Sequence, residues 1–198
     1  KTWESEPHQN ILISFIDSPP KDASKAYQLS LVAGVALFKT LEIILSPTIT
    51  ELETKLKWPN DIFYGEKKLA GILCESTSNG VIIGIGININ QTQFDTALTN
   101  ATSVALENNN QTLDIENLAG KLSSYLEKYY LQLRLLHFNF LEKAYTTSLW
   151  RYNQTSEFTK SGTAFKGEIT GVTKEGKLEI DVKGKPQKFG FKEIEFVY

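Results

Sequence analysis

Hydrophobic positions recur with two different spacings in the first part of the chain. Residues 10–16 form a short apolar run that ends at Asp-Ser-Pro-Pro, which predicts a buried strand. Over residues 22–42 the apolar positions recur every three or four residues, which predicts a helix with one buried face. That face consists of Ala26, Leu29, Ala33, Leu37 and Leu41. Gly34 lies within this helix and suits close packing against a sheet.

Short apolar segments separated by tight turns follow this helix. We predict strands over residues 52–58, 62–64, 68–75 and 81–89. The turns are Pro59-Asn60-Asp61, Gly65-Glu66 and residues 76–80, the last of which contains a hairpin-forming Asn-Gly pair. Such short turns favour antiparallel pairing. Residues 91–112, rich in Asn, Gln and Thr, predict a polar surface loop.

The second half of the chain predicts two helices and then a separate β unit. The apolar faces of the helices are Ile115, Leu118, Leu122, Leu126 and Tyr129 in the first, and Leu135, Phe138, Leu141, Tyr145 and Leu149 in the second. After Asn153, glycines separate short alternating runs at 163–170, 177–182, 187–191 and 194–198, which predict a small antiparallel β-barrel or sandwich. The chain therefore predicts an α+β protein with a larger domain over 1–153 and a small β domain over 154–198.

Composition and charge exclude several classes of protein. The 198 residues are 41% hydrophobic and 22% charged, as in an ordinary globular protein. A net charge of −2 gives no bulk attraction to nucleic acid or to an anionic membrane. No apolar run approaches the roughly 18 residues of a membrane span, and the N-terminus does not resemble a signal peptide. We expect a cytoplasmic protein.

The numbers of cysteine, histidine and methionine residues bear on disulfides, on metal sites and on the extent of the sequence. Cys74 is the single cysteine, which excludes an internal disulfide and fits a reducing cytoplasm. His8 and His137 lie far apart and outside any His/Cys cluster, so we expect no metal ligands in this chain. The sequence contains no methionine and begins at Lys1-Thr2-Trp3, and we expect it to be part of a longer protein.

The strand predicted over residues 81–89 has an unusual face. Because side chains alternate across a sheet, Gly84, Gly86 and Asn88 share one face, while the isoleucines between them share the other. Glycine inside a strand commonly marks the close approach of a ligand or of another backbone. Close packing against the helix over 22–42 is the alternative, and both remain open at this point.

Two lysines lie on either side of the Pro59-Asn60-Asp61 turn, earlier in the chain than this strand. Lys57 and Lys68, read singly, fit exposed residues that extend along the surface. Together beside a glycine-rich strand, they suit an anionic ligand such as a carboxylate next to a phosphate. Trp58-Pro59-Asn60-Asp61 between them also fits a purely structural turn.

Three short motifs in this order identify a known family. The strings "KWPNDI", "KLAGIL" and "GIGININ", all between residues 55 and 90, resemble the biotin–protein ligase family. Residues 3–14 are similar to the segment that follows the family's Gly/Arg-rich loop, and residues 189–194 are similar to the end of its C-terminal domain. The resemblance implies a class II synthetase-like catalytic domain, with a mixed, largely antiparallel sheet packed with helices, and a small SH3-like β-barrel. The Gly/Arg-rich loop is expected to precede Trp3, and a helix-turn-helix domain before it remains an open question.

The resemblance also implies roles for individual residues. Lys68 is expected to contact the biotin carboxylate and the α-phosphate of ATP, as the catalytic group. The wall against the biotin rings is expected from Gly71, Ile72, Gly84 and Gly86. The ATP or adenylate end is expected from Trp3, Lys57, Asn60, Asp61 and Asn88.

The implied reaction has two steps. Biotin and ATP, with Mg²⁺, give biotinyl-5′-AMP, and a lysine of the biotin carrier domain of a carboxylase then attacks it. A lipoate–protein ligase and a non-catalytic biotin-binding regulator are the alternatives. The two-ring head of biotin needs a flat wall, which favours biotin over lipoate. The sequence leaves the oligomeric state and the acceptor open; an exposed edge strand could support a homodimer.

Overall fold

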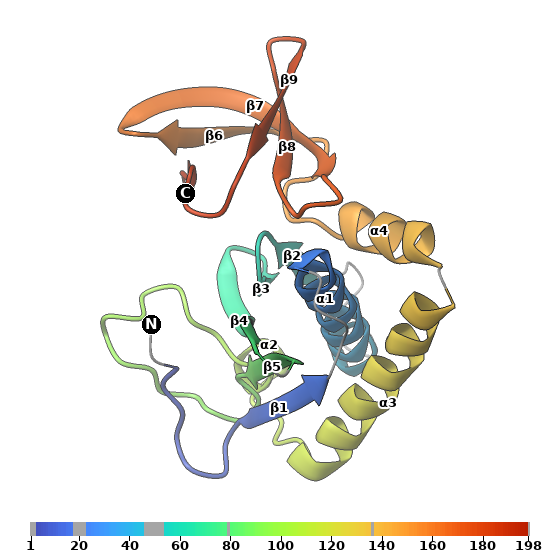
Figure 1. Cartoon of the computed structure of the whole chain (residues 1–198). Helices are drawn as coiled ribbons and strands as arrows, with labels where there is room; N and C mark the ends of the chain where they lie inside the picture. Colours follow the sequence, from blue (N-terminus) through green and yellow to red (C-terminus); the bar gives the residue numbers. More distant parts are fainter. Residues whose placement is uncertain (1–2, 18–22, 46–53, 79, 136, 198) are drawn as a thin grey trace.

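The computed structural model describes residues 3–17, 23–45, 54–78, 80–135 and 137–197. It shows a mixed α+β protein with two antiparallel sheets (Figure 1). The larger sheet is packed with helices, and the smaller one is formed by the last part of the chain. The predicted α+β class is confirmed at this level.

Within the described residues, the larger part contains five strands and four helices. In chain order they are β1 (Ile11–Asp17), α1 (Ala23–Leu45), β2 (Thr54–Lys57), β3 (Asp61–Tyr64), β4 (Lys67–Thr77), β5 (Gly80–Ile87), α2 (Val104–Glu107), α3 (Ile115–Arg134) and α4 (Phe138–Thr147). The strand order is β1-β5-β4-β3-β2, with every neighbouring pair antiparallel. The short turns of the sequence therefore produce the predicted antiparallel pairing.

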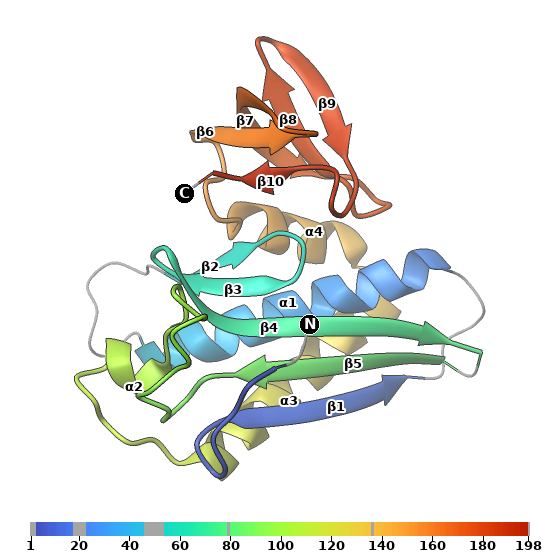
Figure 2. The same ribbon diagram turned by 90° about the vertical axis from the view of Figure 1, so that its left-hand side faces the viewer.

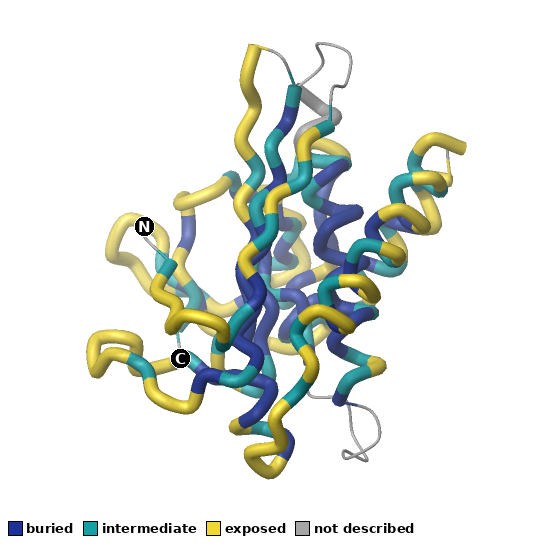
Figure 3. The backbone as a smooth tube through the Cα atoms, turned by 90° about the horizontal axis from the view of Figure 1, so that it is seen from below, coloured by how far each residue is buried: buried dark blue, intermediate teal, exposed yellow. Residues whose placement is uncertain are grey.

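The helices cover one face of this sheet and leave the other face open. α1 lies along the sheet, and α3 and α4 pack on α1 (Figures 1 and 2). Leu29, Leu37 and Leu41 of its predicted face are buried. Gly34 meets β2 and α4, because a Cβ there would lie 3.2 Å from atoms of Leu56 and Tyr145. The middle of the sheet and of α1 is buried, while the outer side of α3 is exposed (Figure 3).

The expectation that no apolar segment approaches the length of a membrane span was wrong for α1. By length and composition, Tyr27–Leu45 would be long and apolar enough to cross a membrane, with a mean hydropathy of 1.7. Within this fold 67% of that window is buried inside the protein, as in the core helix of a globular domain. Its apolar surface is therefore covered by the sheet and by the neighbouring helices.

The last part of the chain forms a second antiparallel sheet. Its strands are β6 (Thr155–Lys160), β7 (Thr163–Val172), β8 (Leu178–Val182), β9 (Lys185–Phe189) and β10 (Glu195–Phe196), in the order β10-β6-β7-β8-β9. β10 and β9 are its edges, and over residues 154–197 no ladder joins them into a closed barrel. Phe158, Ile180 and Phe189 are buried within it.

Three sequence expectations differ from the structure. β6 was not predicted, because Phe158 is its only large apolar residue among polar neighbours. α2 lies inside the expected polar loop, where Ser103 caps it by accepting a hydrogen bond from the backbone N–H of Leu106. Leu135 was expected on a buried face, but α3 continues to Arg134 and leaves Leu135 63% exposed as its C-cap. Residues 52 and 53 of the predicted strand over 52–58 lie outside the described residues.

Candidate functional site

A row of residues crosses the larger sheet on the face opposite α1. The ladder register pairs Lys57 with Asp61, Asp61 with Gly71, Gly71 with Gly86, and Gly86 with Leu12. Directly paired residues point to the same face of a sheet. Two adjacent strands therefore lack side chains at the middle of this row, between Asp61 and Leu12.

The indole of Trp3 covers these two glycines. A Cβ at Gly86 would lie 2.7–2.9 Å from three atoms of the indole, and one at Gly71 would lie 3.0 Å from it. The N-terminal segment accordingly crosses the open face in front of β4 and β5 (Figure 2). Close packing of the glycines on α1, one of the two sequence alternatives, is wrong, because α1 packs on the other face.

Gly84, one alternate position further along β5, is not covered in this way. The nearest atoms to a Cβ at Gly84 belong to Leu73, at 3.8 Å. Exposed apolar side chains surround it on the same face, namely Leu12, Ile16 and Leu73. The indole nitrogen of Trp3 is buried and lacks a hydrogen-bond partner, a state that costs about 1–3 kcal/mol. The open face thus offers a flat apolar surface beside an unpaired donor.

A β-bulge brings Lys68 onto this face. Lys68 and Gly71 are three residues apart, so in a regular strand they would point to opposite faces. The register shifts between Ile62, which pairs with Ala70, and Phe63, which pairs with Lys68, so that Leu69 is the extra residue. Leu69 is then fully buried.

The Lys68 ammonium consequently meets Asp61 and the glycine row. Lys68 Nζ lies 2.7 Å from Asp61 Oδ1 and 5.6 Å from the centroid of the Trp3 ring. The side chains of Lys68 and Asp61 are 35% and 21% exposed, so the pair is accessible to a ligand. An ammonium carries three N–H donors, and the carboxylate uses only part of that capacity.

Backbone contacts from the loop after β5 hold this bulge in place. Lys68 N–H donates to the carbonyl of Asn100, and Thr102 N–H donates to the carbonyl of Lys68. Asn88 is buried, and its side-chain amide donates to the Thr102 carbonyl at 2.8 Å. Asn88 was predicted to contact the nucleotide. In the structure its side chain bonds this loop to the sheet instead. The sequence analysis missed the loop's part in holding Lys68.

The Trp58-Pro59-Asn60 turn is anchored at each residue. Trp58 Nε1 donates to the Gly176 carbonyl at 3.0 Å, and the Tyr145 hydroxyl donates to the Pro59 carbonyl at 3.2 Å. The Trp58–Pro59 peptide is cis. The Asn60 amide donates to the Ile72 carbonyl at 2.6 Å, and Ile72 N–H donates back to the Asn60 carbonyl. Asn60 therefore braces β4 next to Asp61.

Tyr145 remains a proton donor in this arrangement. Burial raises the pKa of Tyr145 above its usual value, and the nearby Asp61 carboxylate raises it further. A hydroxyl that stays protonated can keep its hydrogen bond to the Pro59 carbonyl. The sequence periodicity predicted Tyr145 on the apolar face of a helix and gave no indication of this hydrogen bond.

The structure brings some predicted site residues together and turns others elsewhere. Trp3, Gly71, Gly86, Asp61 and Lys68 form one contiguous group, with Gly84 and Asn60 beside it. The Ile72 side chain lies in the core, so only its backbone borders the site. Lys57 Nζ lies over the rings of Phe63 and Phe196, at 4.9 Å and 5.0 Å from their centroids. In the described ranges no group of three His, Cys, Asp or Glu residues could hold a metal ion.

The sequence of this chain is similar to those of known ligases. Residues 1–91 match the sequence profile of the biotin/lipoate A/B protein ligase family. The bifunctional ligase/repressor BirA of Bacillus spizizenii is 38% identical over 100 residues, which are 48% of this chain and 29% of that protein. The biotin–[acetyl-CoA-carboxylase] ligase of Mycobacterium tuberculosis is 29% identical over 157 residues, 79% of this chain and 58% of that protein. The chain thus spans less than two thirds of either relative.

The fold is also found in solved structures. The biotin protein ligase of Aquifex aeolicus superposes with a TM-score of 0.78 and 24% identity, over 96% of this chain and 82% of that one. The same enzyme in complex with biotin and ATP gives a TM-score of 0.76 at 23% identity, over 94% of this chain and 78% of that one. At this identity the likeness establishes the fold. The sequence match to the biotin/lipoate A/B protein ligase family covers residues 1–91, just under half of the chain.

Proposed function

We propose that this protein activates biotin with ATP to biotinyl-5′-AMP and transfers the biotinyl group to a lysine of a carrier domain of a biotin-dependent carboxylase. The observation that carries the proposal is the bulge that turns Lys68 onto the glycine row, next to Asp61 and Trp3. A flat apolar surface beside a cation suits an acid with a compact, uncharged ring system. The named activities of the relatives in Bacillus and Mycobacterium support the same reaction.

The first step joins two anions, and Lys68 is the residue that would reduce their repulsion. Its ammonium would bridge the biotin carboxylate and the α-phosphate, and would stabilise the charge that grows as the carboxylate oxygen attacks phosphorus. The P–O bond to pyrophosphate breaks, and pyrophosphate leaves. Asp61 would orient the ammonium, since an ion pair at 2.7 Å holds Nζ in one position.

On the open face of the sheet, the glycines and Trp3 would form separate binding areas for biotin and for ATP. Gly84, which the Trp3 indole does not cover, is the proposed wall for the biotin rings, and Gly71 would border the carboxylate beside Lys68. Gly86 admits the Trp3 indole, which would separate biotin from adenine. Asn60 would border the nucleotide end through its position next to Asp61. Lys57 and Asn88 would shape this end indirectly, through the second sheet and through the loop after β5.

Magnesium enters this proposal as part of the MgATP substrate. Asp61, the carboxylate of the site, is already paired with Lys68, and the described residues lack a three-ligand cluster. These residues do not form a protein-built magnesium site, so no step here is assigned to the metal. In the second step the acceptor lysine attacks the acyl carbon, and AMP leaves with the electron pair of the broken C–O bond.

The remaining assignments extend the same proposal. The second sheet would correspond to the family's SH3-like domain, and the larger part to its class II synthetase-like catalytic domain. β1 is an edge of the larger sheet, where a homodimer could form by sheet extension. A cytoplasmic location would fit the single thiol, Cys74.

The test is pyrophosphate release by the full-length protein with MgATP and either biotin or lipoate. Biotin-dependent release is expected. Release with lipoate alone would assign the protein to the other branch of its family, because the profile covers both kinds of ligase. Tight biotin binding without release from a folded protein would instead support a non-catalytic regulator.

A further inference from the structure

The turn that precedes Asp61 lies at an edge of the sheet, where the outer side of β2 is bonded through Leu56 to the backbone of Ser148 and Trp150. It joins β2, the last strand of the sheet, to β3, and each of these strands has only four residues. A short edge hairpin contributes few ladder hydrogen bonds. The position of Asp61 at the start of β3 therefore depends on anchors that lie outside the hairpin.

One of these anchors comes from the C-terminal sheet. The turn between β7 and β8 places the Gly176 carbonyl 3.0 Å from Trp58 Nε1, and Trp58 is only 5% exposed. Trp58 is separated from Asp61 by two residues, Pro59 and Asn60, which are themselves hydrogen-bonded. Trp58 links the second sheet to the start of β3.

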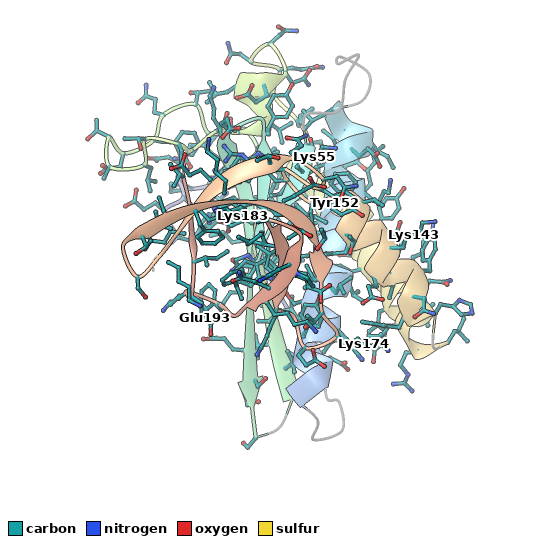
Figure 4. All side chains as sticks on the ribbon, turned by 90° about the horizontal axis from the view of Figure 1, so that it is seen from above. Lys55, Lys143, Tyr152, Lys174, Lys183 and Glu193 are labelled. Carbon is teal, nitrogen blue, oxygen red and sulfur yellow. The ribbon has the colours of Figure 1, made fainter. Side chains whose placement is uncertain are left out.

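The β7–β8 turn is shaped for this contact. Gly176 has φ +85°, a conformation that favours glycine, and a Cβ there would lie 2.6 Å from the ring of Tyr27 on α1. Thr173 closes the turn: its carbonyl accepts from Gly176 N–H, and its hydroxyl accepts from the backbone N–H groups of Glu175 and Lys177. Lys174 of the same turn lies beside α1 in Figure 4.

A second contact holds the same two parts of the protein together. Trp150 Nε1 donates to the Gly65 carbonyl at the other end of β3, and the Trp150 ring lies 5.6 Å from that of Phe196 on β10. Lys57 lies over Phe63 and Phe196. The C-terminal sheet is therefore docked on the larger part at more than one point, through β10 as well as through the β7–β8 turn.

We infer that the β7–β8 turn is a positioning element for the Asp61–Lys68 pair, acting through the hydrogen bond from the Trp58 indole to the Gly176 carbonyl. The C-terminal sheet then contributes to the first step without touching the substrates. What the pair does in that step rests on the proposed function. The positioning itself is a property of the contacts and can be tested separately.

The first test compares Trp58→Phe with the wild type in pyrophosphate release. Phenylalanine keeps a ring and loses the N–H donor, so the protein should fold while the turn loosens. We expect kcat to fall about tenfold, the equivalent of one hydrogen bond, with KM for biotin and ATP within about twofold. A wild-type kcat in a variant that unfolds cooperatively would overturn the inference.

Gly176→Ala and Gly184→Ala form a matched pair of variants. Both glycines lie in hairpin turns with positive φ, +85° and +78°, but a Cβ at Gly184 meets nothing within 4 Å, whereas one at Gly176 meets Tyr27. Both variants place alanine at a positive φ and therefore carry the same kind of backbone strain. Only Gly176→Ala should lower kcat; an equal loss in the two variants would point to general destabilisation and contradict the inference. If Gly176→Ala does not fold, Trp58→Phe still decides.

An Asp61→Asn background shows whether the effect passes through the pair. Adding Trp58→Phe to it should cost little more, because residues that act as a unit are not additive. A further tenfold loss would mean that Trp58 acts by another route.

An NMR measurement separates this inference from the proposed function. The Trp58 indole N–H should exchange slowly in the wild type, and the Asn60 side-chain amide should shift in Trp58→Phe and Gly176→Ala but not in Gly184→Ala. If the wild type released no pyrophosphate, the proposed function would fail while these signals still tested the positioning. Unchanged Asn60 signals in both variants would refute it.

Discussion

Gly86→Ala adds one methyl group where the Trp3 indole contacts β5. The added Cβ would lie 2.7–2.9 Å from three ring atoms, whereas carbon atoms pack at about 3.5–4.0 Å. Trp3 must therefore move by roughly 1 Å or leave the sheet. Gly84→Ala is the matched control, because its nearest neighbour is Leu73 at 3.8 Å.

The size of the effect follows from the contact area. An aromatic side chain of this kind buries roughly 150–250 Å², and about half of that faces the glycines. At about 25 cal/mol per Å², losing this face costs about 2–3 kcal/mol of Trp3 docking. Alanine regains about 0.5–1 kcal/mol over glycine in a strand, so the net cost at Gly86 is about 1–2.5 kcal/mol and at Gly84 is zero or a small gain.

Tryptophan fluorescence of the ligand-free protein reports this displacement. Trp58 and Trp150 are each 5% exposed and should keep their blue-shifted emission, so a red-shifted component in Gly86→Ala comes from Trp3. Acrylamide should quench that component. An emission spectrum equal to that of Gly84→Ala would refute the reasoning, because it would mean that Trp3 is not held against Gly86.

Other perturbations test separate contacts. Lys68→Ala should lower the rate of pyrophosphate release by about two orders of magnitude or more. The free energy of unfolding should change by less than about 1 kcal/mol, since a partly exposed ion pair contributes little. Release at the wild-type rate would show that Lys68 is not a catalytic residue. Tyr145→Phe deletes the hydroxyl that donates to the Pro59 carbonyl and should cost about 0.5–1.5 kcal/mol in urea unfolding at neutral pH, and no loss would show that the bond is not formed. Because burial raises the pKa of Tyr145 and of Tyr27 above the value of 10.0 that applies in the unfolded chain, the stability they contribute is present below pH 10.0 and is lost as pH rises beyond it. The fall in melting temperature above pH 10.0 should be shallower in Tyr145→Phe, and equal slopes would contradict the assigned burial.

The sequence predicted the larger elements well where one physical signal dominated. The three-to-four-residue spacing identified α1 and α3, and the tight turns predicted the antiparallel ladders of the larger sheet. It failed at β6, whose alternation carries a single large apolar residue, and at the end of α3. Local pattern cannot show which polar strand will find a partner, because that depends on the sheet already formed around it.

The sequence also predicted only part of the candidate site. Glycine at positions 84 and 86 indicated a close approach to one face of the strand, and the motifs around Lys68 predicted an anion site. The sequence did not show that the close approach at Gly86 is made by Trp3, 83 positions earlier in the numbering. It also did not show that Lys57 turns toward two aromatic rings rather than toward Lys68.

By itself the sequence determined the residue types that the site needs: a lysine, a carboxylate and small residues on neighbouring strands. Only the tertiary structure decided that they face the same way. Lys68 and Gly71 are an odd number of positions apart, and strand alternation alone would separate them across the sheet. The bulge at Leu69 reverses that parity, and its position is set by the ladder with β3 and by the loop that reaches back to Lys68, both of which are contacts between segments distant in sequence.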